Sequence, residues 1–159
     1  MKRRFFQVNI KPFRFLLFSL FILLSSFAFA QTASELDAML QTETVTAAFA
    51  ARFVLGAADL LPVNVSGADA ENAAYDMAKS NGWLKATASD PITLKETAYL
   101  IMKAFNLPGG VMYSIFRNPR YAYREMVYQK LIVGQTDEKM TLSGARLLQI
   151  LDNVMRSEE

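Results

Sequence analysis

Two stretches of this chain match each other without a gap at an offset of 48 residues, and this internal repeat limits the folds open to it. Ala74-Tyr75 recurs as Ala122-Tyr123, and Ile92-Thr93-Leu94 recurs as Met140-Thr141-Leu142. Val45-Thr46 stands 47 residues before Ile92-Thr93 and indicates a third, shortened copy. Repeated units of this length bury their apolar faces against one another. The pattern therefore favours a surface built by several small units over one catalytic pocket.

The first 30 residues have the organisation of a secretory signal peptide. The segment 15–27 is apolar apart from serines, and Ala28-Phe29-Ala30 has the A-x-A form that signal peptidases cut. The apolar run is shorter than the ~20 residues that a membrane-spanning helix needs. We therefore predict cleavage after Ala30, export to the periplasm or cell envelope of a bacterium, and no stable transmembrane segment afterwards. The basic residues that precede the apolar run are Lys2, Arg3, Arg4, Lys11 and Arg14.

Cleavage of this leader would reverse the sign of the net charge. The full chain has 17 basic and 15 acidic residues, and the leader holds five basic residues and no acidic ones. Residues 31–159 therefore carry 12 basic and 15 acidic side chains. The basic balance of the full chain gives no reason to expect a nucleic-acid partner.

The chain contains no His and no Cys. Their absence removes His-based triads, thiol nucleophiles, and zinc sites made of thiolates or imidazoles. Acidic pairs such as Asp137-Glu138 are expected to lie in loops as solvated charges, and not to act as an acid and a base. We predict no catalytic residues, no metal and no cofactor, and hence a non-enzymatic protein. An enzyme with an unfamiliar carboxylate or Ser/Lys site is the remaining alternative.

Residues 31–159 have helical patterning throughout, so we predict a single all-α domain. After Thr93, apolar residues recur at spacings of three and four and form one stripe along a helix. Thr93 is expected to cap this helix, with Glu96 completing a capping box. Thr46 and Thr141 are expected to cap the matching helices of the other two units.

A shorter helix is predicted upstream in each full unit, over 70–81 and over 119–130. Each is expected to end near a glycine-containing turn, at Gly82 and at Gly134. Trp83 occupies the position that Leu131 holds in the next unit, which favours a place in the core. The other residues predicted to be buried are Leu84, Leu94, Ala98, Ile101, Phe105, Ile132, Leu142, Leu148, Leu151 and Val154.

Two segments resemble S-layer homology repeats: Ala73–Leu84 followed by Pro91–Glu96, and Tyr121–Gly134 followed by Met140–Leu142. Repeats of that family run from a helix through a glycine-containing loop to an I-T-R-A-E-like start of a second helix. The resemblance implies an S-layer-homology-like helical domain, with a shortened unit over 31–62 and full units over 63–108 and 109–159. It also implies a module that attaches exported proteins to peptidoglycan or cell-wall polymers.

The chain departs from the family at the arginine of that segment, which helps to bind an acidic wall glycan. Ala47, Leu94 and Leu142 stand at this position. Leucine has no hydrogen-bond donor on its side chain and cannot pair with a carboxylate. We therefore expect any binding of an anionic glycan to use other residues.

The stretch 112–128 is the best candidate for a relocated binding surface, because five aromatic residues and three arginines gather in it. Aromatic faces can stack on sugar rings, and guanidinium groups can hold carboxylates or phosphates bidentately. The alternative is that the tyrosines pack half-buried and the arginines extend over them. The candidate ligand-binding residues are Tyr113, Arg117, Arg120, Tyr121 and Arg124, together with Lys95 of the I-T-x-x-E-like segment.

The predicted function is that of an exported cell-envelope binding module, with peptidoglycan or an anionic wall glycan as its partner. The alternative is a periplasmic scaffold on the same helical fold that contacts an envelope protein.

Overall fold

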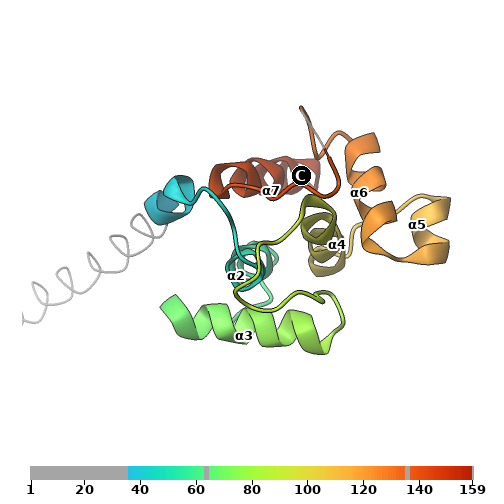
Figure 1. The fold of residues 1–159 in the computed structure, drawn as a ribbon. Coiled ribbons are helices and arrows are strands. Elements are labelled where there is room, and N and C mark those ends of the chain that lie inside the picture. The colour runs from blue at the N-terminus through green and yellow to red at the C-terminus, as the bar shows by residue number, and fades with distance from the viewer. Residues whose placement is uncertain (1–35, 63–64, 135–136, 159) are drawn as a thin grey trace, which may run out of the picture. The chain divides into compact units, whose positions relative to one another are not determined.

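The computed structural model describes residues 36–62, 65–134 and 137–158 (Figure 1). The predicted signal peptide at 1–30 lies outside the described residues. The chain divides into a unit over Met1–Met39 and a compact unit over Leu40–Glu159, which holds helices α2 to α7. Within the described residues, none of the helices has both the length and the apolar character needed to cross a membrane.

The prediction of an all-α fold is confirmed, since the described residues form helices and no strands. Residues 36–41 are also helical. The helices of the compact unit are α2 (Ala47–Ala57), α3 (Gly67–Ser80), α4 (Leu94–Ala104), α5 (Val111–Phe116), α6 (Pro119–Tyr128) and α7 (Gly144–Glu158).

Three segments, 42–47, 90–95 and 138–144, hydrogen-bond to one another in a closed ring. Each segment contains one of the repeated threonines and leads into α2, α4 or α7. We call this arrangement the hydrogen-bonded ring. The first and second segments are joined by Ala47 N to Asp90 O (2.9 Å) and Ile92 N to Val45 O (3.0 Å). The second and third are joined by Leu94 N to Met140 O (2.9 Å) and Lys95 N to Glu138 O (3.1 Å). The first and third are joined by Val45 N to Leu142 O (3.0 Å) and Gly144 N to Thr42 O (2.9 Å). The three units are therefore joined pairwise by their main chains.

Side-chain caps start α2 and α4 where the sequence predicts them. The Thr46 hydroxyl accepts a hydrogen bond from Phe49 N at 3.3 Å. Thr93 and Glu96 form the predicted capping box, and the Glu96 carboxylate accepts from Thr93 N at 3.0 Å. These bonds satisfy amide groups that have no partner within the helix.

The predicted cap of the last helix at Thr141 is wrong. α7 begins at Gly144, and the Ser143 hydroxyl accepts from Arg146 N at 3.3 Å. Thr141 instead pairs with Thr93 within the hydrogen-bonded ring. Because two residues separate Thr141 from α7, matching helix positions in the second and third units lie 50 residues apart and not 48.

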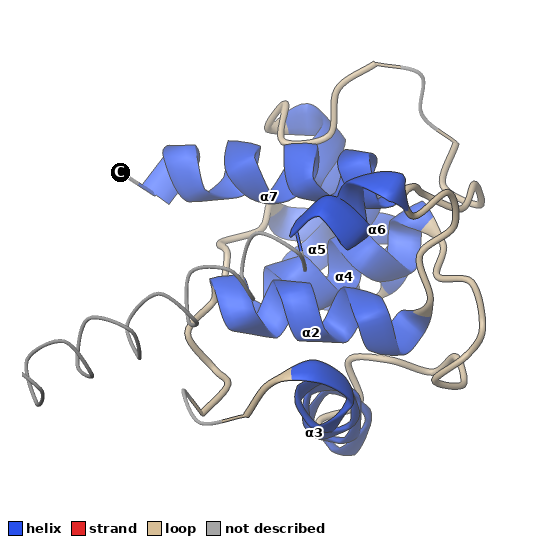
Figure 2. Ribbon diagram, turned by 90° about the vertical axis from the view of Figure 1, so that its left-hand side faces the viewer, coloured by secondary structure: helices blue, strands red, loops and turns tan. Residues whose placement is uncertain are grey.

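The helices pack across the unit boundaries. α3 packs against α2 of the preceding unit, and α6 packs against α4 of the preceding unit. Figures 1 and 2 show α2 and α3 crossing each other, because each is seen end-on in the view where the other runs across. The buried residues of α3 are Ala70, Ala74 and Ala78, whose small side chains allow a close approach to α2.

Most of the predicted core is confirmed. Leu84, Leu94, Ala98, Ile101, Ile132, Leu142, Leu151 and Val154 are buried. Phe105 is only half-buried, because it is the residue that ends α4. Leu148 is also half-buried, because the two-residue shift centres the buried stripe of α7 on Leu147, Ile150, Leu151 and Val154.

Four helices end in the same way, with a residue of positive φ followed by a backbone bond to the last turn. The N–H of the next residue bonds the carbonyl five residues before it, at 2.8–3.0 Å, as in a Schellman motif. The residues with positive φ are Asp59 after α2, Gly82 after α3, Asn106 after α4 and Lys130 after α6. The prediction of Gly82 is confirmed, but Lys130 and not Gly134 ends the helix of the third unit.

Replacement of Ser143 by Ala should lower the free energy of unfolding by about 1 kcal/mol, because Arg146 N loses the hydroxyl that caps α7. Thr141→Ala is the matched control, since Thr141 is exposed and outside the helix. It should change the free energy by less than about 0.5 kcal/mol. Urea unfolding followed by circular dichroism measures both, and a larger loss for Thr141→Ala would contradict this helix start.

Replacement of Lys130 by Gly should raise the free energy of unfolding by about 1 kcal/mol, because Lys130 has a φ of 60°. Gln129→Gly is the control, because Gln129 has a φ of −76°. That change should lower the free energy by about 0.5–1 kcal/mol. Thermal or urea unfolding checks the two opposite signs, and a destabilised Lys130→Gly variant would be incompatible with the left-handed conformation.

Candidate functional site

One face of α4 is left open by the packing of its neighbours. α4 packs on α2 and α6 through its apolar residues, whereas Glu96, Tyr99, Lys103 and Asn106 recur at helical spacing on another face. Two hollows lie along this face. The first, of about 110 Å³, is lined by Gly82, Trp83, Lys85, Glu96, Tyr99, Arg117, Asn118 and Pro119. The second, of about 350 Å³, is lined by Met102, Lys103, Asn106, Leu107, Pro108, Gly109, Tyr113, Ser114 and Arg117.

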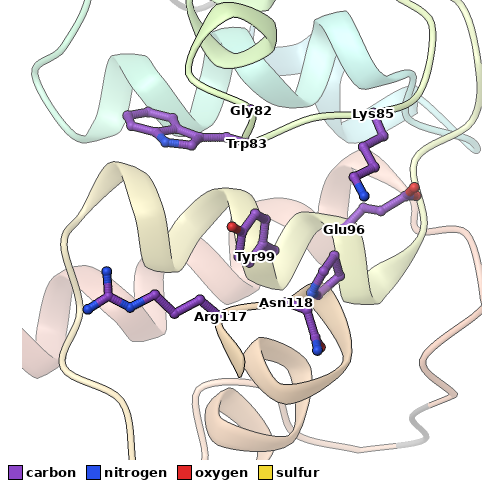
Figure 3. Close-up of a pocket in the computed structure, with 8 residues that line it drawn as sticks. Gly82, Trp83, Lys85, Glu96, Tyr99, Arg117 and Asn118 are labelled. Atoms are coloured by element: carbon purple, nitrogen blue, oxygen red, sulfur yellow. The ribbon is translucent and has the colours of Figure 1, made fainter. Parts of the chain in front are cut away.

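The two hollows are neighbours along α4, and we call the pair the α4 groove. They share Arg117, and the Lys103 ammonium group of the second hollow lies 5.5 Å from the ring centre of Tyr99 in the first. Figure 3 shows the first hollow, with Lys85 and Glu96 at one end, Arg117 at the other and Tyr99 between them. The groove therefore runs between the second and third units.

The wall that carries Trp83 and Lys85 is held in place by α3. The left-handed conformation of Gly82 turns the chain out of α3 and toward this wall. The Tyr75 hydroxyl donates to Ala86 O at 2.9 Å, and Lys79 Nζ donates to Lys85 O at 2.8 Å. The side chains of one helix thus fix the loop that faces the next helix, α4.

A turn at residues 87–90 connects this wall to the hydrogen-bonded ring. Thr87 N donates to Asp90 Oδ2 at 2.9 Å, and this bond holds the pKa of the Asp90 carboxyl below its usual value. Asp90 O then accepts from Ala47 N within the ring. The wall is therefore anchored at both of its ends.

The predicted core position of Trp83 is wrong. Leu131, at the matching position of the third unit, is buried, but Trp83 is half-buried and lines the α4 groove. In the second unit this position faces the α5–α6 turn of the third unit across the groove. Part of the indole surface is therefore available to a ligand.

The opposite wall is the turn between α5 and α6. Arg117 ends α5 in the left-handed conformation, with φ 41°, and its Nε donates to Ser114 O at 3.4 Å. Asn118 caps α6 by accepting from Tyr121 N at 3.2 Å. The local cap thus places Arg117 at the junction of the two hollows.

Tyr113 closes the second hollow and is itself buried. Burial is the main cause that raises the pKa of the Tyr113 hydroxyl, with Tyr99 adding to it and Arg117 opposing it. A Cβ atom on Gly109 would lie 2.1 Å from Tyr113 Cδ1, so only glycine lets the chain pass this ring. The ring therefore fills the space beneath the loop 107–110.

The charge of the groove is mainly positive. Lys85, Lys103 and Arg117 contribute three cations to its lining, and Glu96 contributes one carboxylate. The Glu96 carboxylate is occupied by the capping box of α4, where it accepts from the Thr93 amide and hydroxyl groups. The groove therefore presents cations beside two aromatic rings, Tyr99 and Trp83.

The predicted binding residues are distributed over separate surfaces. Arg117 and Tyr113 line the α4 groove, but the other four do not. Arg120 is exposed, with its Nε 3.9 Å from Glu138 Oε2, and Arg124 is also exposed on α6. The Tyr121 ring stacks on Phe116 with 5.0 Å between the ring centres. Lys95 is half-buried, and its backbone N–H belongs to the hydrogen-bonded ring.

Three charged or aromatic groove residues were not predicted from the sequence: Lys85, Tyr99 and Lys103. Glu96, Tyr99 and Lys103 follow one another at spacings of three and four, which marks a polar and aromatic face opposite the apolar stripe. That signal was available in the sequence. Lys85 carried no such signal, because only the loop conformation brings it to α4.

Among the residues that the structure describes, no three His, Cys, Asp or Glu side chains come together in a way that could hold a metal ion.

Comparison of the chain with protein-family models, with curated proteins and with solved structures gives no match. The groove itself therefore carries the functional interpretation.

Proposed function

We propose that this chain is an exported, non-enzymatic module that binds an anionic glycan of the bacterial envelope in the α4 groove. The observation that carries the proposal is that two aromatic rings and three cations line two neighbouring hollows along α4. The rings are those of Trp83 and Tyr99, and the cations are Lys85, Lys103 and Arg117. The apolar faces of sugar rings pack on aromatic side chains, and carboxylates or phosphates pair with lysine and arginine.

The form of the groove favours a chain-like ligand. It extends along α4 from Glu96 to Asn106, past both hollows, and is lined by loops of two different units. A polymer could lie along such a surface and contact both hollows at once. Each hollow alone offers few contacts, so affinity would come from several weak sites acting together.

The engagement of Glu96 supports binding over acid–base chemistry. A general acid or base needs a carboxyl group that is free to exchange a proton with the substrate. The Glu96 carboxylate already accepts hydrogen bonds from the amide and hydroxyl groups of Thr93. Glu96 therefore serves to cap the start of α4. The other charged groups of the groove are cations, which are suited to binding an anionic ligand.

The test is sedimentation of residues 31–159 with purified peptidoglycan sacculi, because this chain keeps every described helix. Tyr99→Ala and the double variant Lys103→Gln/Arg117→Gln should each weaken binding about tenfold, as expected when a stacking surface or two charge-assisted contacts are lost. Binding by the parent should weaken with added salt, because charges are screened over roughly 8–10 Å at physiological ionic strength.

The matched control is Arg120→Gln/Arg124→Gln, which removes the same number of charges outside the groove. This variant should bind sacculi as tightly as the parent. Equal binding by the groove variants and the parent would overturn the proposal, and so would an equal loss in the control.

A further inference from the structure

Helix α5 presents an apolar face to solvent. Val111, Met112, Ile115 and Phe116 are 73%, 58%, 67% and 54% exposed, and Tyr113 is the one buried residue of this helix. We call these four residues the α5 apolar face. Figure 1 shows α5 at the edge of the compact unit, beyond α4 and α6. Exposed apolar residues that gather on one face of a helix mark a site that contacts another protein or a membrane.

The sequence around this face is strongly basic. Residues 97–124 contain Lys103, Arg117, Arg120 and Arg124 and no Asp or Glu, whereas the rest of residues 31–159 has eight basic and 15 acidic side chains. Two carboxylates of flanking segments come near. Glu138 lies beside Arg120, and the Glu125 carboxylate lies next to Gly110 at the start of α5, where it also accepts from Gln129 Nε2 at 2.9 Å. Arg124 remains exposed on α6, the helix against which α5 packs. The apolar face therefore lies in a part of the chain where cations outnumber carboxylates, with Arg117 at the end of α5 and Arg120 and Arg124 exposed on α6.

We infer that the α5 apolar face docks on the surface of a bilayer rich in anionic lipid. The side chains of Met112 and Ile115 would enter the boundary between headgroups and acyl chains, and Arg120 and Arg124 would pair with lipid phosphates. An exposed apolar helix face together with exposed arginines on the neighbouring helix is a combination that binds such an interface. One short helix and a few cations give weak and reversible attachment.

Charge favours the lipid surface over a second copy of this chain. A symmetric dimer through α5 would bring the arginines of both copies together, and like charges at an interface oppose association. An anionic bilayer covers the apolar side chains and neutralises the arginines at the same time. The inference is independent of glycan binding, because Trp83, Lys85 and Tyr99 lie outside the α5 apolar face.

The experiment is co-sedimentation of residues 31–159 with phosphatidylglycerol vesicles and with phosphatidylcholine vesicles. The parent should bind the anionic vesicles, bind the neutral ones much less, and detach as salt is added. Met112→Ser/Ile115→Ser should weaken binding about tenfold, since two apolar side chains no longer leave water. Met140→Ser/Met155→Ser is the matched control, because these residues are 41% and 45% exposed on other elements, and it should bind like the parent.

A second pair of variants separates this inference from the proposed function. Arg120→Gln/Arg124→Gln should weaken vesicle binding several-fold while leaving the binding of sacculi unchanged, whereas Tyr99→Ala should do the reverse. This arginine pair also tests the inference if Met112→Ser/Ile115→Ser fails to fold. Failure of the parent to bind anionic vesicles would overturn the inference. The inference would also be overturned if Met112→Ser/Ile115→Ser and Arg120→Gln/Arg124→Gln bound these vesicles as tightly as the parent. A dimer that depends on Met112 and Ile115, without vesicle binding, would assign the face to a second copy.

Discussion

The backbone hydrogen bonds that join segments 42–47, 90–95 and 138–144 determine where the other parts of the compact unit can lie. Each segment leads directly into α2, α4 or α7, so the ring fixes the starting points of these three helices. α3 and α6 then fill the spaces beside α2 and α4. α4 is left with one open face, and the loops that leave α3 and α5 border it. The α4 groove is therefore a consequence of how three units meet, and no single unit contains it.

The sequence predicts those parts of the fold that depend on local chemistry. Thr46 and Thr93 precede apolar stripes, and their side chains cap the helices that follow. The start of α7 was missed because the match of Thr141 to Thr93 was extended into the helix, whereas two further residues precede α7 in the third unit. The left-handed turn at Lys130 was missed for a different reason. Lysine does not signal positive φ, and Gly134 nearby does.

The candidate site could be predicted only in part, because closeness along the chain was taken for closeness in space. Arg117, Arg120 and Arg124 fall within eight residues. Arg117, however, occupies a left-handed turn before α6, whereas Arg120 and Arg124 lie one turn apart along that helix. Helical spacing alone makes Tyr99 and Lys103 neighbours on α4, but only the fold shows that Trp83 and Lys85 of another segment line the same hollow as Tyr99.

The hydrogen-bonded ring also determines when the chain can reach its final form. The bond from Gly144 to Thr42 joins residues roughly 100 positions apart, so much of the chain must be fixed in space before this contact is gained. During synthesis, the first segment emerges long before the third is made. The first and second segments therefore lack their hydrogen-bond partners in segment 138–144 until that segment has been made.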